Sequence, residues 1–488
     1  MTTKLSKLLA GIKVEEVIGE TDKNITSLES DSRKVKKDGM FVAVKGVTTD
    51  GHKYIPVVTG ANVAAVVCEE LPSTLDRGIT YIRVADSAKA LGELASAWYG
   101  HPSRNLKLVG VTGTNGKTTT ATLLYEMAKL EGYRAGLLST VCNFIGDKKV
   151  PSTHTTPDPL TLNSLLADMV QEGCDYAFME VSSHATDQKR VAGLDFAGGV
   201  FSNLTRDHLD YHGTVDNYMK AKKAFFDMLG PNAFALINED DKAGRFMVQN
   251  TKAKIYTYSL RADADFRGKV LETRLDGTLL MLNGNEVEVM FTGKFNAYNL
   301  TAVYGASILC GFDPQEVLVN MSRLIPVAGR FQPFISEDKV AAIVDYAHTP
   351  DALVNVLDTI REIVGSNGKV ITVVGAGGNR DHGKRPLMAQ EAACRSDLLI
   401  LTTDNPRNEE PDAIIDDMEA GLSSDERNRT LRITDRREAI KTAVERAEPG
   451  TVVLIAGKGH ETYQEVNGIR HHFDDSEEVK EALAKRNK

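Results

Sequence analysis

Cysteine is scarce in this 488-residue sequence, and the five that occur are Cys68, Cys142, Cys174, Cys310 and Cys394. They are scattered along the chain, odd in number and without the spacing of metal ligands. This pattern argues against a fold that depends on a disulfide framework. We expect reduced thiols in the core of a cytoplasmic protein.

Long apolar runs and an excess of basic residues are also missing. The apolar stretch at residues 8–12 is bounded by Lys7, Lys13 and Glu15, so we expect no signal peptide there. No apolar run approaches the ~18 residues that a membrane span needs. The formal net charge of −9 argues against nucleic acid or an anionic membrane as the main partner.

The residues that are present have an ordinary globular composition, with 42% hydrophobic and 26% charged residues. A chain of 488 residues is too long for a single hydrophobic core, so we expect two to four domains. Short apolar runs alternate with helical patterns along much of the chain, which is typical of α/β proteins.

One stretch carries the clearest chemical signal. The strand-like residues 108–112 lead into a Gly-rich turn, and Lys117-Thr118 then opens onto a helical pattern at 121–130. Backbone N–H groups of such a loop, with the positive end of the helix dipole, form a cradle for phosphate oxygens. Lys117 would reach the terminal phosphates and the Thr118 hydroxyl would bind Mg²⁺. Strict Walker spacing requires glycine where this chain has Val111, so the loop is a variant, and we interpret it as a nucleotide triphosphate site.

The first hundred residues alternate short strands and helices. Buried strands are predicted at 41–44, 64–68 and 79–84. The turn at 30–33 precedes the first of them and is dense in hydrogen-bonding groups. A polar turn with local side-chain caps explains this turn as well as a binding role does. The stretch His101-Pro102-Ser103 predicts a boundary before the phosphate loop.

The middle of the chain repeats the pattern of a strand that ends in polar groups. The strand at 176–180 ends in Glu180, a position where α/β sheets present metal-binding acids. Residues 200–212 have the same form, and a helix at 218–226 follows, whose lysines chemistry alone cannot tell apart. Residues 250–292 are predicted to form short strands, with turns at Asp276-Gly277 and Asn283-Gly284.

Beyond a boundary at 327–332, strands and helices alternate again. The four strands end in functional-looking loops, which predicts a doubly wound sheet with a site at its carboxyl edge; they are 340–344, 370–374, 398–401 and 452–455. The glycines at 375–378 lack the third glycine of a dinucleotide site. Arg380, Lys384 and Arg385 follow at once and favour a carboxylate or phosphate clamp.

Together these motifs resemble the Mur ligase family, ATP-dependent enzymes that add amino acids to peptidoglycan precursors. The similarity covers essentially the whole chain in the family's order of three α/β domains. It implies an N-terminal domain at 1–103 that binds the UDP-muramoyl-peptide and a central P-loop domain at 104–328 that binds ATP. It also implies a C-terminal Rossmann-like domain at 329–488 that binds the amino acid.

The resemblance also implies the nucleotide and metal sites. The ATP-binding positions are matched by Gly113, Thr114, Asn115, Gly116, Lys117, Thr118, Thr119, Asn299, Arg330, Asp345 and His348. The implied Mg²⁺ ligands are Thr118, Glu180, His208 and Lys222, with Lys222 as a CO₂-derived carbamate. The implied catalytic set is Lys117, Glu180, His208 and Lys222. Lys222, and not Lys220 or Lys223, follows Tyr218 in the family's Tyr-x-x-Ala-Lys pattern. One departure is Gln332, where the family usually has Glu.

The two remaining substrates have matching positions as well. Those that hold the UDP-muramoyl-dipeptide are matched by Ser30, Ser32, Thr155, Thr156, Ser182, Gln188 and Arg190. Those that hold the amino acid are matched by Arg380, Asp404, Asn405, Pro406, Arg407, Gly457 and Glu461. The Asp-Asn-Pro-Arg stretch resembles that of diaminopimelate-adding members. Arg407 offers a planar fork for the carboxylate that lysine lacks.

The implied reaction adds meso-diaminopimelate to the D-Glu γ-carboxylate of UDP-N-acetylmuramoyl-L-Ala-D-Glu through an acyl phosphate, with ATP as substrate and Mg²⁺ as cofactor. We expect a cytoplasmic monomer with small-molecule partners, without nucleic acid or membrane insertion. A lysine-adding ligase would share every motif but the Arg407 region. A nucleotide-dependent switch or transport ATPase would share the phosphate loop alone and would not need Lys222.

Overall fold

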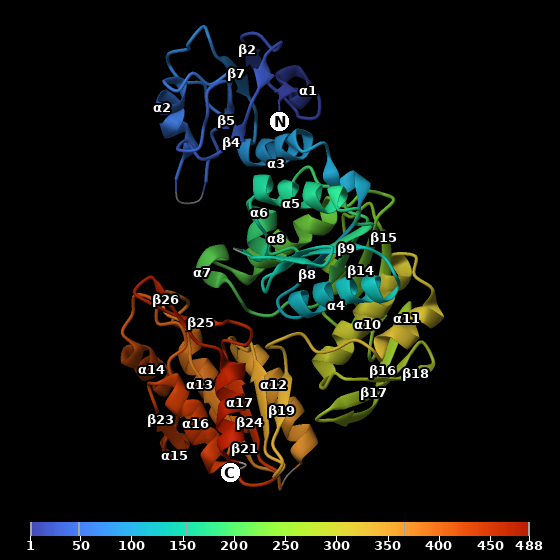
Figure 1. Cartoon of the computed structure of the whole chain (residues 1–488), viewed down its shortest axis with the longest axis vertical. Coiled ribbons are helices and arrows are strands. Elements are labelled where there is room, and N and C mark those ends of the chain that lie inside the picture. Colours follow the sequence, from blue (N-terminus) through green and yellow to red (C-terminus); the bar gives the residue numbers. More distant parts are fainter. Residues whose placement is uncertain (1, 47–48, 153, 366, 487–488) are drawn as a thin grey trace.

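The structure, a computed structural model, describes residues 2–46, 49–152, 154–365 and 367–486. Three sheets, of five, eleven and six strands, follow one another along the chain. In Figure 1 they lie one above the other, with the N-terminal unit at the top and the C-terminal unit at the bottom. The α/β fold class is confirmed, because each sheet is largely parallel and carries helices.

The N-terminal unit contains a five-stranded sheet in the order β2-β7-β6-β5-β4. The strands predicted at 41–44, 64–68 and 79–84 are β5, β6 and β7, whose apolar runs are almost wholly buried, as expected of parallel strands. The elements are β1 Thr3–Lys4, α1 Leu5–Leu9, β2 Glu16–Ile18, β3 Asn24–Ile25, β4 Leu28–Glu29, β5 Met40–Val42, the 3₁₀ helix Gly51–Tyr54, α2 Ile55–Thr59, β6 Ala65–Cys68, β7 Thr80–Arg83, α3 Ser87–Trp98 and the 3₁₀ helix Pro102–Asn105.

The central unit is built on an eleven-stranded sheet in the order β11-β10-β9-β12-β8-β13-β14-β15-β16-β17-β18. The seven central strands in this order, β9-β12-β8-β13-β14-β15-β16, pair in parallel, and β10, β11, β17 and β18 extend the sheet at its two ends by antiparallel pairing. The strands are β8 Lys107–Thr112, β9 Ala135–Leu138, β10 Asn143–Ile145, β11 Lys148–Val150, β12 Tyr176–Glu180, β13 Gly198–Phe201, β14 Phe234–Asn238, β15 Lys254–Ser259, β16 Phe266–Arg274, β17 Gly277–Leu282 and β18 Asn285–Val289.

Helices cover both faces of this sheet and form two apolar cores. The helices are α4 Lys117–Leu130, α5 Pro159–Gln171, α6 Ser183–Asp187, α7 Leu209–His212, α8 Val215–Asp227, α9 Gly244–Met247, α10 Lys294–Leu309 and α11 Pro314–Met321. The predicted turn at Asn283-Gly284 is confirmed. The turn expected at Asp276-Gly277 is wrong by one residue, because Gly277 already pairs with Arg274 as the first residue of β17.

The C-terminal unit confirms the predicted doubly wound sheet. Its strand order is β19-β20-β24-β21-β22-β23, parallel except for the edge strand β19. Helices α12, α13 and α14 pack on one face, and α16 and α17 on the other. The elements are β19 Gln332–Ile335, β20 Ala341–Asp345, α12 Pro350–Val364, β21 Val370–Val374, α13 Lys384–Arg395, β22 Leu398–Leu401, α14 Pro411–Glu419, α15 Ser424–Asn428, β23 Thr430–Arg432, α16 Arg436–Arg446, β24 Val452–Ala456, β25 Tyr463–Val466, β26 Ile469–His472 and α17 Asp475–Arg486.

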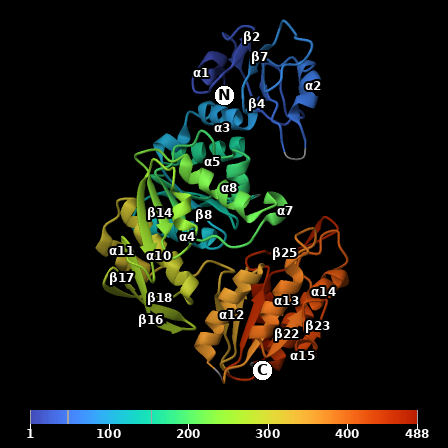
Figure 2. The ribbon, with the colours of Figure 1, turned by 180° about the vertical axis from the view of Figure 1, so that it is seen from behind.

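The central unit separates the other two, as Figure 2 shows from behind. Helix α3 of the N-terminal unit packs against α5. Polar contacts cross from the central to the C-terminal unit: Asn115 Nδ2 donates to Asp351 Oδ2 at 3.1 Å, and Arg330 Nη2 donates to Thr118 Oγ1 at 3.2 Å. None of the helices in the part of the chain that the structure describes has the length and apolarity that a membrane crossing requires.

Candidate active site

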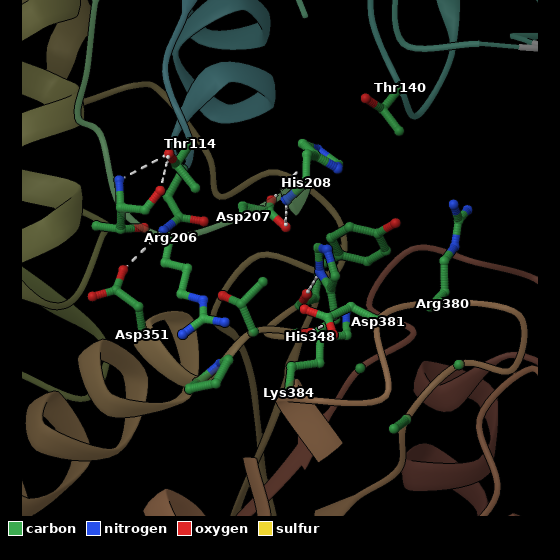
Figure 3. Close-up of a pocket in the computed structure, with 18 of the residues that line it drawn as sticks. Thr114, Thr140, Arg206, Asp207, His208, His348, Asp351, Arg380, Asp381 and Lys384 are labelled. Carbon is green, nitrogen blue, oxygen red and sulfur yellow. Dashed lines mark hydrogen bonds and ion pairs between the residues drawn. The ribbon is translucent and has the colours of Figure 1, made fainter. Parts of the chain in front are cut away.

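A cleft of about 540 Å³ lies between the central and C-terminal units. It collects loops from the carboxyl ends of both parallel sheets, where α/β proteins bind ligands. In Figure 3, Asp207 and His208 of the central unit lie across it from His348 and Lys384 of the C-terminal unit. The predicted site residues that line it are Thr114, Asn115, Gly116, Lys117, Thr118, Thr155, Glu180, Ser182, His208, Lys222, Arg330, His348, Arg380, Asp404, Asn405, Arg407, Gly457 and Glu461.

Other predicted residues lie outside the lining; they are Ser30, Ser32, Gly113, Thr119, Thr156, Gln188, Arg190, Asn299, Asp345 and Pro406. Several of them support it from behind. Thr156 donates to the backbone oxygen of Glu180 at 2.8 Å, and Arg190 Nη1 donates to the backbone oxygen of Thr156 at 2.8 Å. Asp345 accepts from the backbone of Phe331 at 2.7 Å and so holds the segment that carries Arg330.

The turn at 30–33 is closed by its own side chains. Arg33 donates to both Asp31 carboxylate oxygens, at 2.9 and 2.8 Å, and its guanidinium holds the pKa of Asp31 well below the ordinary value. Ser30 is exposed and Ser32 is half-buried. Local side-chain caps are therefore present in this turn, and a role for Ser30 and Ser32 in binding stays a prediction.

The phosphate loop joins β8 to the N-terminus of α4, as predicted. Gly113 and Gly116 have φ of 149° and 86°, and a Cβ on Gly113 would lie 1.9 Å from Ser202 Oγ, so glycine is required there. The Lys117 ammonium donates to the backbone oxygens of Gly113 and Thr114, at 2.9 and 2.8 Å. Burial lowers the pKa of Lys117. The loop thus brings backbone donors and a lysine to one concave site.

Glu180, at the end of β12, lies directly beside this loop. Its Oε1 accepts from Thr118 Oγ1 at 2.9 Å and from the backbone N–H of Thr140 at 2.7 Å. Glu180 is only 1% exposed, so these donors offset the cost of burying its charge. A carboxylate and a hydroxyl at hydrogen-bond distance form a donor set that suits Mg²⁺.

Three lysines of α8 have different environments. Lys222 is 1% exposed, and its Nζ donates to the backbone oxygen of Gly113 at 2.7 Å. Burial, followed by the charge of Lys117, lowers the pKa of Lys222 well below its ordinary value. Lys220 forms an ion pair with Asp216 at 2.6 Å, and Lys223 forms one with Asp227 at 2.6 Å. Of the three, Lys222 alone lines the cleft beside the phosphate loop.

His208 precedes α7 in a left-handed conformation, with φ of 53°. Burial lowers the pKa of its imidazole to about 4, against the opposing charge of Asp207. A neutral imidazole is the form that binds metal ions. Among the described residues, no three His, Cys, Asp or Glu side chains gather into a metal cluster. A cation here would therefore need hydroxyl, carbamate or phosphate oxygens in addition.

Two guanidiniums lie in the C-terminal half of the cleft. Within the described ranges, no carboxylate pairs with Arg380 or Arg407, and Arg407 Nη1 donates only to the backbone oxygen of Gly378, at 2.6 Å. The neighbouring Arg385 is instead buried in ion pairs with Glu409 and Asp417, at 2.9 and 2.8 Å. Arg380 and Arg407 therefore leave guanidinium donors available to an anionic ligand.

Two carboxylates line the same half of the cleft. Asp404 follows β22 and Glu461 follows β24, and both line the cleft. Burial, and then the charge of Asp404, raises the pKa of Glu461. Gly457 has φ of 119°, and a Cβ there would lie 2.6 Å from Asp404 Oδ2, so glycine lets the two loops approach.

Sequence reasoning missed several polar residues of the cleft. Lys384 Nζ donates to the backbone oxygen of His348 at 3.0 Å, and Asp351 meets the phosphate loop through Asn115. Lys384 was visible in a basic cluster, but its partner is 36 residues away in the sequence. Gln332, the departure noted in the resemblance, accepts from the backbone N–H of Gly329 at 3.0 Å and so holds the turn that carries Arg330.

The chain belongs to the Mur ligase family. Models of the family match 24–99 ("Mur ligase family, catalytic domain"), 111–307 ("Mur ligase middle domain") and 329–459 ("Mur ligase, glutamate ligase domain").

Individual relatives are more specific. The chain is 59% identical to a UDP-N-acetylmuramoyl-L-alanyl-D-glutamate--2,6-diaminopimelate ligase of Parabacteroides distasonis, over 99% of both chains. It is 41% identical to the protein of that name in Geobacillus kaustophilus, over 95% of this chain and 96% of the relative. A solved structure titled with the same enzyme name is 35% identical, covers 100% of both chains and has a TM-score of 0.71.

Proposed function

We propose that this chain is an ATP-dependent ligase that joins meso-diaminopimelate to the D-Glu γ-carboxylate of UDP-N-acetylmuramoyl-L-Ala-D-Glu, forming ADP and phosphate. One observation carries the proposal: Arg380 and Arg407, which pair with no carboxylate of the described residues, line the same cleft as Asp404, Glu461 and the phosphate loop. An amino acid end with both a carboxylate and an ammonium fits this charge arrangement. The names of the close relatives support it.

The reaction takes place in two steps. A γ-carboxylate oxygen of D-Glu attacks the γ-phosphorus of ATP, and the bond from that phosphorus to the bridging oxygen breaks. ADP departs, and the D-Glu carboxyl is now an acyl phosphate. The neutral amine of diaminopimelate then attacks the acyl carbon and loses a proton, and the C–O bond to phosphate breaks. Catalysis of this kind consists mainly of positioning and charge neutralisation. Lys117 and the backbone donors of the loop would position the phosphates and neutralise their charge.

Mg²⁺, when bound, neutralises phosphate charge. The residues of this chain fit it: Thr118 and Glu180 would hold one ion, and His208 with carbamylated Lys222 a second. A neutral amine is the form that reacts with CO₂, and burial favours that form because it lowers the pKa of Lys222; the resulting carbamate replaces a cation by an oxygen donor. The remaining predicted nucleotide contacts are Gly113, Thr114, Asn115, Gly116, Thr119, Asn299, Arg330, Asp345 and His348.

The UDP-muramoyl-dipeptide would lie toward the N-terminal unit. Thr155 and Ser182 line the cleft on the central side, and Gln188 and Arg190 form a hydrogen-bonded pair behind them. We place the uridine end near Ser30 and Ser32. The proposal takes domain limits of 1–103, 104–328 and 329–488 and a monomer in the cytoplasm.

Release of ADP, measured with the UDP-muramoyl-dipeptide and either meso-diaminopimelate or L-lysine, tests this function. We expect turnover that requires the dipeptide and strongly prefers diaminopimelate. Equal or better use of lysine would identify a lysine-adding ligase instead. Hydrolysis of ATP without any amino acid acceptor would favour a nucleotide-dependent switch or transport ATPase.

Arg407→Ala tests how the acceptor is recognised. A charge-assisted contact contributes about 1.5–3 kcal/mol, so kcat/KM for diaminopimelate should fall by about one to two orders of magnitude. L-Lysine lacks that carboxylate, so its poor turnover should change little or rise. Arg470→Ala is the matched control, because Arg470 is exposed and lies outside the cleft lining. An equal loss for both amino acids would mean that Arg407 only supports the fold.

A further inference from the structure

Lys458 does not line the cleft but contacts two residues that do, Asn405 and Glu461. Lys458 is 0% exposed, and its Nζ donates to Asn405 Oδ1 at 3.2 Å and to Glu461 Oε2 at 3.3 Å. The ammonium also lies 5.5 Å from the centre of the Tyr463 ring. Burying an ammonium is costly unless it is paired, so Lys458 and Glu461 depend on each other.

The two oxygens of Glu461 have different surroundings. Oε2 accepts from Lys458 and also from Asn405 Nδ2, at 2.7 Å. No residue in the described ranges donates to Oε1, and Glu461 lines the cleft. Asn405 is itself fixed, because its Oδ1 accepts from the backbone N–H of Glu465 at 2.9 Å. One oxygen is therefore held by the protein, and the other remains free to accept from a ligand.

We propose that Lys458 is a positioning residue for the acceptor amino acid: it keeps Glu461 anionic and oriented so that Oε1 accepts hydrogen bonds from the substrate's ammonium group. The inference rests on the proposed function, because it requires an acceptor that carries an ammonium at this end. Lys458 does not touch the substrate and acts only through Glu461 and Asn405.

The charge balance of this corner supports the inference. Asp404 and Glu461 bring two negative charges close together, and Lys458 offsets one, which leaves a net charge that matches one ammonium. Burial and Asp404 raise the pKa of Glu461, whereas Lys458 and Asn405 lower it. The other titratable groups close enough to be influenced by the charges of Asp404 or Glu461 are Tyr346, Tyr463, Arg436 and Lys384. Without Lys458, Glu461 would titrate at higher pH, and a protonated carboxyl is a poor ammonium acceptor.

Lys458→Met tests this directly, with steady-state kinetics from pH 6 to pH 9. At neutral pH we expect the KM for diaminopimelate to rise by about tenfold or more, because Glu461 loses the donor that holds its Oε2 and because its protonated form accepts poorly from an ammonium. The kcat and the KM for ATP should change little. Because the raised pKa of Glu461 is overcome at higher pH, the KM should recover toward wild type as the pH increases. An unchanged KM, or a rise that is independent of pH, would overturn the inference.

A double-mutant cycle separates positioning from a merely structural role. Glu461→Gln should raise the KM for diaminopimelate at every pH, and adding Lys458→Met should then change it little, because no anion remains to be held. Additive losses would overturn the inference. If Lys458→Met alone does not fold, the double variant can still be compared with Glu461→Gln for its KM for diaminopimelate. The double variant buries no unpaired charge.

Tyr463→Phe serves as the matched control, since it keeps the ring under the ammonium and should leave the pH profile unchanged. Wild-type turnover that does not depend on diaminopimelate would overturn the proposed function and this inference with it. A wild type that depends on diaminopimelate, beside a Lys458→Met variant with unaltered kinetics, would overturn this inference alone.

Discussion

Lys220 and Lys222 are two residues apart on α8, yet only Lys222 is enclosed by the protein. Lys222→Ala should be nearly inactive, because it removes the amine that would carry the carbamate. Short-chain carboxylates should restore part of the rate by supplying oxygen donors in its place. ADP release with and without added acetate or formate measures both effects.

Lys220→Ala is the control for this prediction. Its ammonium forms an exposed i,i+4 ion pair with Asp216, and such pairs are worth little. The variant should keep nearly full activity and should not respond to carboxylates. Identical behaviour of the two variants would show that the Tyr218-based assignment of Lys222 is wrong.

The resemblance to the family could single out Lys222, through the family's spacing from Tyr218, because that pattern is local. The sequence could not single out Lys458, whose partner Asn405 lies 53 residues away and meets it only when β22 and β24 carry their loops to the same sheet edge. The contact of Asn115 with Asp351 is hidden for the same reason, as it spans 236 residues. Long-range pairing of polar groups has no signature in a single sequence.

Helices α16 and α17 are joined by two ion pairs of very different burial. Arg436 and Asp475 are both 0% exposed and meet at 2.7 Å, whereas Arg437 is 60% exposed in its pair with Glu478. Asp475→Asn leaves a buried guanidinium uncompensated and should lower the free energy of unfolding by about 3–5 kcal/mol. Glu478→Gln should cost about 1 kcal/mol or less.

Denaturant unfolding followed by circular dichroism compares these two variants. Both substitutions remove a carboxylate from α17 and keep the side-chain shape, so burial is the variable that differs. Equal losses of stability would contradict this account. ADP release should remain measurable in Glu478→Gln, because neither Arg437 nor Glu478 lines the cleft.

The strands were well predicted from sequence where both faces are buried, since runs such as 452–455 are apolar throughout. The hairpin of β25 and β26 was missed because its residues are mixed in polarity and half-buried or exposed. The one-residue error at Gly277 has a similar origin. Its pairing with Arg274, and the close approach of Val289, depend on strand register and not on the dipeptide.

The N-terminal unit, near which we place the uridine end of the substrate, lies at the opposite end of the molecule from the C-terminal unit that closes the cleft. We therefore expect that nucleotide binding can be abolished without loss of binding of the UDP-muramoyl-dipeptide. Lys117→Ala should abolish ligation and the rise in thermal midpoint that a non-hydrolysable ATP analogue produces. At about a hundredfold excess over Kd, that ligand would stabilise the wild type by about 2.7 kcal/mol. Stabilisation by the UDP-muramoyl-dipeptide should persist in the variant.

Lys129→Ala is the control, because Lys129 lies on the same helix α4 but pairs with Asp147 at 3.0 Å, outside the cleft lining. Differential scanning fluorimetry with each ligand reports both results. Appreciable turnover in Lys117→Ala, or a full thermal shift with the ATP analogue, would contradict the assignment of the phosphate loop.

The cleft takes its two walls from two different sheets, and we propose phosphate chemistry on one wall and acceptor recognition on the other. Mutations in the loops after β21, β22 and β24 could therefore change which amino acid is added, without altering the nucleotide site. The same division bears on inhibitor design. A compound anchored at Arg380 and Arg407 would select among ligases by their acceptor, whereas one anchored on the phosphate loop would have to compete with cellular ATP.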